Sequence, residues 1–178
     1  MFIVFPVSLL ESPFSNFLKP DAPLITLFIA MILVVGLFEE GAKSLLVYSF
    51  HYQHPEFNES LDGIIYGVTV GLGFAAFENV FYTILYGYKV GLVRAVVTSL
   101  IHASFTGIFG YFLGQAKMND NKGLIISGFI LVTIFHGLYD FLLISNIIGL
   151  FSTVLIVIIL QIIIARLIKI TLKESPFR

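Results

Sequence analysis

Residues 38–43 read Phe-Glu-Glu-Gly-Ala-Lys and lie within an otherwise apolar stretch. They place the carboxylates of Glu39 and Glu40 and the ammonium group of Lys43 inside a predicted membrane span. An ionisable residue at the centre of a bilayer costs about 2.5–3.5 kcal/mol on insertion scales, so such residues are usually paired and functional. We interpret the glutamates as candidate bases that activate water, with Lys43 in support. An ion pair that joins helices, or an ion path, is the alternative.

Three further stretches carry polar side chains that could take part in chemistry. Glu78 is followed by Asn79, His102 lies among small residues, and His136 precedes Asp140 by four positions. Residues four apart on a helix point to one side, which suits two metal ligands or a histidine oriented by a carboxylate. We interpret Asn79 as an amide that joins helices.

These side chains together predict a metal site. Imidazole and carboxylate ligands without sulfur suit Zn²⁺ or a similar divalent ion, with one position left open for water. In this interpretation Glu40 or Glu39 activates the water. The predicted ligands come from three separate stretches and are Glu78, His102, His136 and Asp140.

The composition predicts an all-α integral membrane protein. The 178 residues are 58% hydrophobic and only 12% charged, about half the charged fraction of a soluble domain. Apolar runs of about 18 residues or more favour helices over the alternating strands of a barrel. The chain has no cysteine, which excludes a disulfide framework and a thiolate nucleophile. A net charge of −1 without a basic stripe gives no sign of a nucleic-acid partner.

Five stretches are predicted to span the membrane within a single domain, residues 1–178. Asp21 and Asp62 are expected to be the N-caps of the first two helices. Residues 1–21 are expected to lie in the interface or to form a partial N-terminal segment. The predicted spans cover about residues 22–50, 62–86, 92–116, 123–144 and 147–168.

Spacing within the spans predicts how they pack and face the membrane. Gly63, Gly67 and Gly71 recur every four residues, which predicts a ridge where a neighbouring backbone approaches closely. The last span is expected to be a lipid-facing flank, and Arg94 to be an interfacial anchor. Six Lys and Arg residues lie on the side of the C-terminus and three on the other side, with Lys43 left out. This bias predicts a multi-pass protein of the cell membrane with a cytoplasmic C-terminus.

The ordered motifs of residues 37–141 resemble the PrsW family of intramembrane proteases and, more distantly, the CAAX prenyl proteases and Abi proteins. The resemblance departs at the front, because members often carry further spans before the Glu-Glu helix and this sequence has room for at most a fragment of one. The motifs are Glu39-Glu40-Gly-Ala-Lys43, Leu-Asp62-Gly-Ile-Ile-Tyr-Gly continuing to Phe-Glu78-Asn79, Arg94 with Leu-Ile-His102-Ala-Ser-Phe-Thr-Gly, and His136-Gly-Leu-Tyr-Asp140.

The resemblance implies an intramembrane endopeptidase in which Glu39, Glu40 and His136 are essential, and it implies a metallopeptidase. Its substrate would be a single-span membrane protein such as an anti-sigma factor, cut at site 1 in regulated intramembrane proteolysis during a stress response. The likeness to CAAX proteases implies a metal-free alternative, in which Glu40 with His102 activates water while His136 and Asn79 stabilise the oxyanion. A non-catalytic scaffold or an ion carrier is a third possibility, although no internal repeat typical of carriers is evident. The expected surroundings are the lipid bilayer and the substrate, with the oligomeric state left open.

Overall fold

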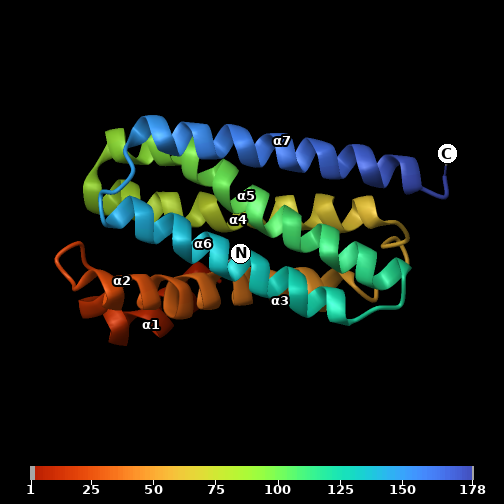
Figure 1. Ribbon diagram of the computed structural model, residues 1–178, viewed down its shortest axis with the longest axis horizontal. Coiled ribbons are helices and arrows are strands. Elements are labelled where there is room, and N and C mark those ends of the chain that lie inside the picture. Colours follow the sequence, from red (N-terminus) through yellow and green to blue (C-terminus); the bar gives the residue numbers. More distant parts are fainter. Residues whose placement is uncertain (1–2, 178) are drawn as a thin grey trace.

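The computed structural model describes residues 3–177, which form a bundle of long helices lying along one axis (Figure 1). Residues 1, 2 and 178, at the ends of the predicted N-terminal segment and the basic C-terminal tail, lie outside the described residues. Within the described range five helical segments are long and apolar enough to cross a membrane, and no strand is present, which confirms the predicted all-α membrane bundle. The five segments are Leu24–His51, α4 (Ser60–Tyr86), α5 (Tyr88–Met118), α6 (Gly123–Ile144) and α7 (Leu150–Glu174).

The first spanning segment is not one regular α-helix. It consists of α2 (Leu24–Ala30), a π-helical turn η2 (Met31–Gly36) and α3 (Leu37–His51). The helix begins after Pro23, whose backbone is extended, and Asp21 lies in the turn before it. The expectation that Asp21 is the N-cap was therefore wrong.

The π-helical turn is held tightly against α6. A Cβ atom added at Gly36 would lie only 2.5 Å from the carbonyl oxygen of Thr133, and one added at Gly137 would lie 2.5 Å from the carbonyl oxygen of Met31. The two backbones thus touch directly. Glu39 and Glu40 follow three and four residues after Gly36, so this contact brings them beside the part of α6 that carries His136.

The predicted glycine ridge is confirmed at the contact between α4 and α5. A Cβ atom added at Gly63, Gly67 or Gly71 would clash with a carbonyl oxygen of α5. Only residues without a side chain permit this approach. The oxygens that line this seam belong to Gly110, Thr106 and His102, so the seam fixes the position of His102 against α4.

The start of α4 differs from expectation. The helix begins at Ser60, Glu59 is its N-cap, and Asp62 occupies the third helical position. Asp62 accepts hydrogen bonds from the backbone N–H groups of Asn58 and Glu59, each 3.0 Å long, which completes a capping box. Asp62 therefore stabilises the helix start from within, and its predicted role as the N-cap itself was wrong.

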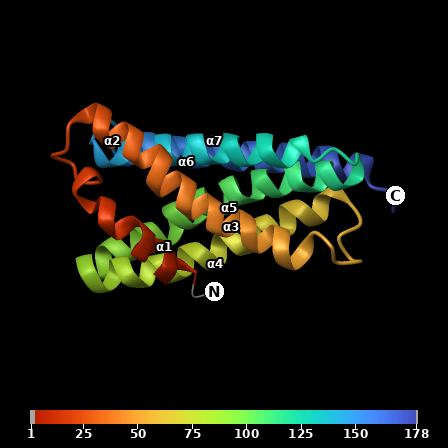
Figure 2. The ribbon, with the colours of Figure 1, turned by 90° about the horizontal axis from the view of Figure 1, so that it is seen from below.

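Two short helices precede the first span. α1 (Val4–Glu11) and the 3₁₀-helix η1 (Ser12–Phe17) are too short to cross a bilayer. α1 lies across the bundle beside α3 and α4 (Figure 2). Its residues Val4 and Val7 are buried against Phe74 of α4. This segment therefore packs on the bundle.

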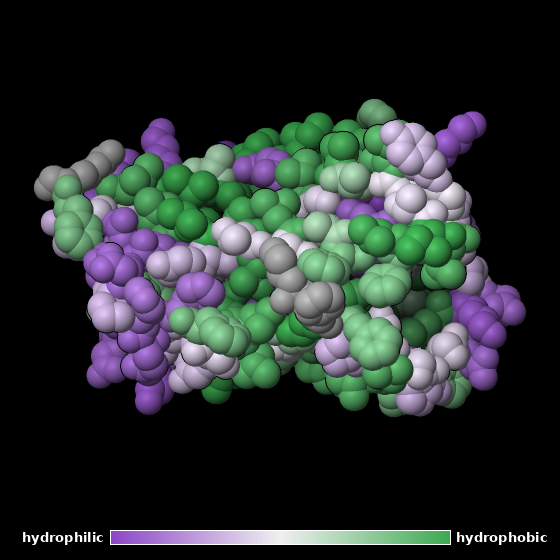
Figure 3. Space-filling model, turned by 180° about the vertical axis from the view of Figure 1, so that it is seen from behind, coloured by the Kyte–Doolittle hydropathy of each residue, from purple (hydrophilic) through white to green (hydrophobic). Residues whose placement is uncertain are grey.

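The surface of the bundle suits a bilayer. Figure 3 shows one face on which mainly apolar side chains cover the middle of the long axis, while hydrophilic side chains gather toward the two ends. α7 is the least buried of the five segments. It lies at the edge of the bundle (Figure 1). An apolar cleft of about 450 Å³ is lined by residues of α5, α6 and α7.

Candidate active site

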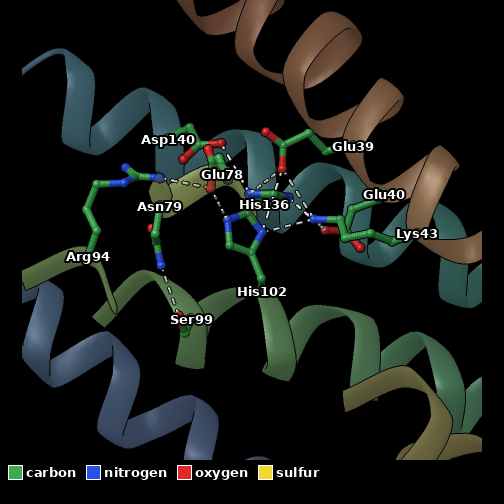
Figure 4. Close-up of polar contacts among 10 residues, drawn as sticks. All are labelled: Glu39, Glu40, Lys43, Glu78, Asn79, Arg94, Ser99, His102, His136 and Asp140. Carbon is green, nitrogen blue, oxygen red and sulfur yellow. Dashed lines mark hydrogen bonds and ion pairs between the residues drawn. The ribbon is translucent and has the colours of Figure 1, made fainter. Parts of the chain in front are cut away.

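Four helices converge on one polar cluster inside the bundle (Figure 4). α3, α4, α5 and α6 each contribute charged or imidazole side chains. Of the eight residues proposed from sequence, all but Asn79 are joined by hydrogen bonds or ion pairs into a continuous network. Its members are Glu39, Glu40, Lys43, Glu78, His102, His136 and Asp140.

Lys43 lies at the centre of the network and is fully buried. Its Nζ atom is 2.6 Å from Oε1 of Glu40 and 3.3 Å from Oε2 of Glu39. It also donates to Nδ1 of His102 across a distance of 3.0 Å. An ammonium group has three N–H donors, and each has a partner here. The lysine therefore compensates the buried glutamates and connects α3 to α5.

His136 is held on both sides of its ring. Nδ1 lies 2.7 Å from Oε1 of Glu40, while Nε2 lies 3.3 Å from Oδ2 of Asp140 and 3.8 Å from Oε2 of Glu39. The ring of Phe105 stacks on the imidazole at a centroid distance of 5.4 Å. A histidine whose Nδ1–H donates to a carboxylate keeps Nε2 available as a ligand or proton acceptor. Glu40 is thus placed to orient His136.

His102 connects the central lysine to the outer part of the cluster. With Lys43 donating to Nδ1, its Nε2–H donates to Oε2 of Glu78 across 3.0 Å. The same carboxylate oxygen lies 2.8 Å from Nη2 of Arg94. Glu78 is therefore fixed between an imidazole and a guanidinium group.

Arg94 belongs to the cluster, so its expected role as an interfacial anchor was wrong. Its guanidinium group lies 3.5 Å from the ring centroid of Tyr82 as well as beside Glu78. The sequence contained a signal for this position. Arg94, Thr98 and His102 recur every four residues, so they share one face of α5.

Asn79 points away from the imidazoles. Its Nδ2–H donates to Oγ of Ser99 on α5 across 3.1 Å. This contact joins α4 to α5, which is the role that the sequence favoured for Asn79.

The donor atoms fit a divalent cation. Glu39, His102 and His136 can each offer one ligand atom, and these atoms lie within 4.8 Å of one another. Glu39 was expected as a base and lies in this group, whereas Glu78 and Asp140, expected as ligands, lie just outside it.

The charges of the cluster also fit a cation. Four carboxylates, those of Glu39, Glu40, Glu78 and Asp140, face the two fixed cations Lys43 and Arg94, which leaves two negative charges uncompensated. Uncompensated buried charge is strongly unfavourable, so either a divalent cation or two protons must balance it.

A bundle of apolar helices that encloses carboxylates and imidazoles defines a membrane-embedded protein with a hydrolase-like site. The chain matches the PrsW family intramembrane metalloprotease over residues 1–167, and it belongs to this family.

Curated relatives agree with this assignment. The chain is 42% identical to Protease PrsW of Shouchella clausii over 115 residues, which cover 64% of this chain and 54% of the relative. It is 41% identical to Protease PrsW of Halalkalibacterium halodurans over 144 residues (79% and 65%), and 35% identical to that of Bacillus subtilis over 119 residues (65% and 55%). The chain thus spans between half and two thirds of the length of these relatives. No solved structure matches it.

Proposed function

We propose that this protein hydrolyses a peptide bond of a membrane-anchored protein within the bilayer. The observation that carries the proposal is the buried arrangement of Glu40, His136 and Asp140, in which both imidazole nitrogens face carboxylates. Family membership supports proteolysis as the reaction. The motif resemblance supports a single-span substrate such as an anti-sigma factor cut at site 1. The distribution of Lys and Arg supports a cytoplasmic C-terminus.

In this proposal Glu39, His102 and His136 hold a divalent cation such as Zn²⁺. A cation bound there supplies Lewis-acid chemistry, because it polarises the scissile carbonyl and makes water a stronger nucleophile at neutral pH. His102 can bind it through Nδ1 only if Lys43 gives up its hydrogen bond to that atom.

The chain's own residues handle the proton. Asp140 and Glu39 flank Nε2 of His136. With Glu39 on the cation, Asp140 is the carboxylate left to take a proton from water as its oxygen attacks the carbonyl carbon. The same proton then passes to the leaving amine nitrogen as the C–N bond breaks. Glu40 keeps His136 in the required tautomer.

One observation favours a second candidate, a metal-free glutamate mechanism. The ammonium group of Lys43 already lies between Glu39, Glu40 and Nδ1 of His102, where it supplies a cation to the cluster. A carboxylate assisted by His102 would then activate water alone. The two candidates differ in their dependence on metal.

The test uses purified protein in proteoliposomes with a fluorogenic library of single-span membrane peptides. Glu40→Gln and His136→Ala should each lower cleavage by about a hundredfold or more, since the first removes the carboxylate that orients His136 and the second removes the imidazole itself. His54→Ala is the matched control because His54 lies in an exposed loop, and it should cleave like wild type. Full activity in both cluster variants would contradict the proposal.

Elemental analysis of the same preparations separates the two mechanisms. Roughly one metal ion per chain, lost in His136→Ala and in His102→Ala, would support the cation site. Wild-type protein that contains no metal and still cleaves in the presence of a chelator would favour the glutamate mechanism.

A further inference from the structure

A carboxyl group outside the five spanning segments also faces the cluster. α1 buries Val4 and Val7 against Phe74 of α4, with only 3% and 4% of their surfaces exposed. Val4, Val7 and Glu11 follow i, i+3, i+7 spacing, so they share one face of this helix. Glu11 therefore points from the end of α1 toward the bundle.

Glu11 lies within electrostatic range of the acidic residues of the cluster. Its Oε1 atom is buried and has no hydrogen-bond partner among the described residues. Burial, followed by the carboxylates of Glu39, Glu78 and Asp140, raises the pKa of Glu11 to about 9. Glu11 thus lies close enough to residues of α3, α4 and α6 to interact with their charges.

Glu11 approaches the cluster from its open side. The side chains of Glu39, Glu78 and Asp140 are 8%, 14% and 19% exposed, whereas those of Glu40 and Lys43 are fully buried. A peptide can reach the imidazoles only from the exposed side. The carboxylates whose charges act on Glu11 are therefore the ones on this exposed side.

A substrate needs hydrogen-bond acceptors at this position. A peptide must be extended where it is cut, and within a bilayer its backbone N–H groups cannot bond to water. Glu78 is committed to Arg94 and His102, and Oε1 of Glu40 to Lys43 and His136. Oε2 of Glu40 also has no partner, but this side chain is fully buried and does not reach the exposed side of the cluster. The buried oxygen of Glu11 has no such commitment, and an unpaired buried acceptor is costly to maintain unless a ligand satisfies it.

We propose that Glu11 is a substrate-binding residue whose free oxygen accepts a hydrogen bond from a backbone N–H group beside the scissile bond. This inference rests on the proposed protease function. It assigns α1 a part in substrate binding in addition to its packing on α3 and α4.

Cross-linking tests the location directly, because the chain contains no cysteine. Glu11→Cys and Leu9→Cys are each made in the Glu40→Gln background. Leu9 is the matched control, because it lies on the opposite face of α1 and is 56% exposed. The probes are single-span peptides with one cysteine each, placed in turn along the span. We expect disulfide cross-links at position 11 for probe cysteines near the centre of the span and none at position 9. Equal labelling at both positions, or none at position 11, would overturn the inference.

Steady-state kinetics tests the role. Glu11→Ala should raise KM about tenfold with little change in kcat, because a bond to substrate is lost without disturbing the chemistry. Glu11→Gln keeps an acceptor oxygen and should remain within about threefold of wild type. A fall in kcat alone, equal in both variants, would contradict a role in binding.

Wild-type protein that cleaves no library member would refute the protease, whereas cleavage without cross-linking at position 11 would refute only this inference.

Discussion

The cluster has two halves that differ in exposure. The closed half comprises Glu40, Lys43, His102 and His136, with side chains 0–3% exposed, and the open half comprises Glu78, Arg94 and Asp140, with side chains 14–19% exposed. Glu39, 8% exposed, lies between the two halves. In the closed half every charge has a partner close by, so its geometry is set by these ion pairs. In the open half the side chains are partly exposed, so this is the part of the network that water, a cation or a peptide meets first. The comparison teaches that one network combines a buried half, which fixes the imidazoles in place, with a partly exposed half, through which the network meets its surroundings.

Breaking the closed half should have the largest effect. Lys43→Met removes the fixed cation that pairs with Glu39 and Glu40, and loss of one partner of a buried pair costs about 3–5 kcal/mol. We expect a large fall in thermal stability, measured in detergent, together with loss of cleavage.

A double variant sharpens this prediction. Glu40→Leu combined with Lys43→Met replaces the buried pair by apolar side chains, which is often neutral for stability. Stability should recover while activity stays absent. A Lys43→Met single variant as stable as wild type would show that packing, rather than charge, holds the closed half together.

A change in the open half should affect chemistry more than folding. Asp140→Asn removes a charge 3.3 Å from Nε2 of His136, and such changes beside metal ligands lower metal affinity by about 10–100-fold. Titration with Zn²⁺, followed by calorimetry, measures the affinity. The unfolding temperature should stay near that of wild type. A variant that unfolds while binding metal normally would reverse the roles assigned to the two halves.

The smallest effect is expected at the edge of the open half. Arg94→Gln removes the ion pair with Glu78 and the guanidinium group that lies on the ring of Tyr82. Cleavage should fall about tenfold, as it does when a residue that orients a carboxylate of a site is lost. Arg94→Lys keeps the charge but not the planar stacking, so it should recover only part of the loss. Initial rates of cleavage measure both variants. Activity in Arg94→Lys as low as in Arg94→Gln would mean that geometry, not charge, is what Glu78 requires.

The sequence was sufficient to predict the membrane bundle and the polar residues that face its interior, because hydropathy and four-residue spacing are local properties. It could not assign partners within the cluster. The predicted ligands included Glu78 and Asp140, whereas the group of neighbouring ligand atoms contains Glu39 with His102 and His136. Spacing on one helix does not determine how that helix is rotated against the others.

Two other features had weak local signals. Residues 31–36 are an ordinary apolar run without proline, so nothing in their types distinguishes a π-helical turn from an α-helix. Glu11 lies in a short helix whose apolar neighbours have no long periodic pattern, and only packing on α4 shows which way it faces. Both features depend on tertiary contacts.

The π-helical turn also governs how the gene can tolerate small deletions. A π-turn behaves as an extra residue within an α-helix, and each residue of an α-helix turns the chain by about 100°. Losing one codon from η2 would leave a span of 27 residues in place of 28, still ample to cross a bilayer. Because the π-turn already absorbs one extra residue, the shortened segment would close into a regular α-helix and leave Glu39 and Glu40 facing α6. A codon lost from α3 before Glu39 has no such slack and would turn both glutamates away from α6 by about 100°. Both chains would insert into the membrane, but only the second would fail as a catalyst, so chemistry constrains the length of α3 more strictly than that of η2.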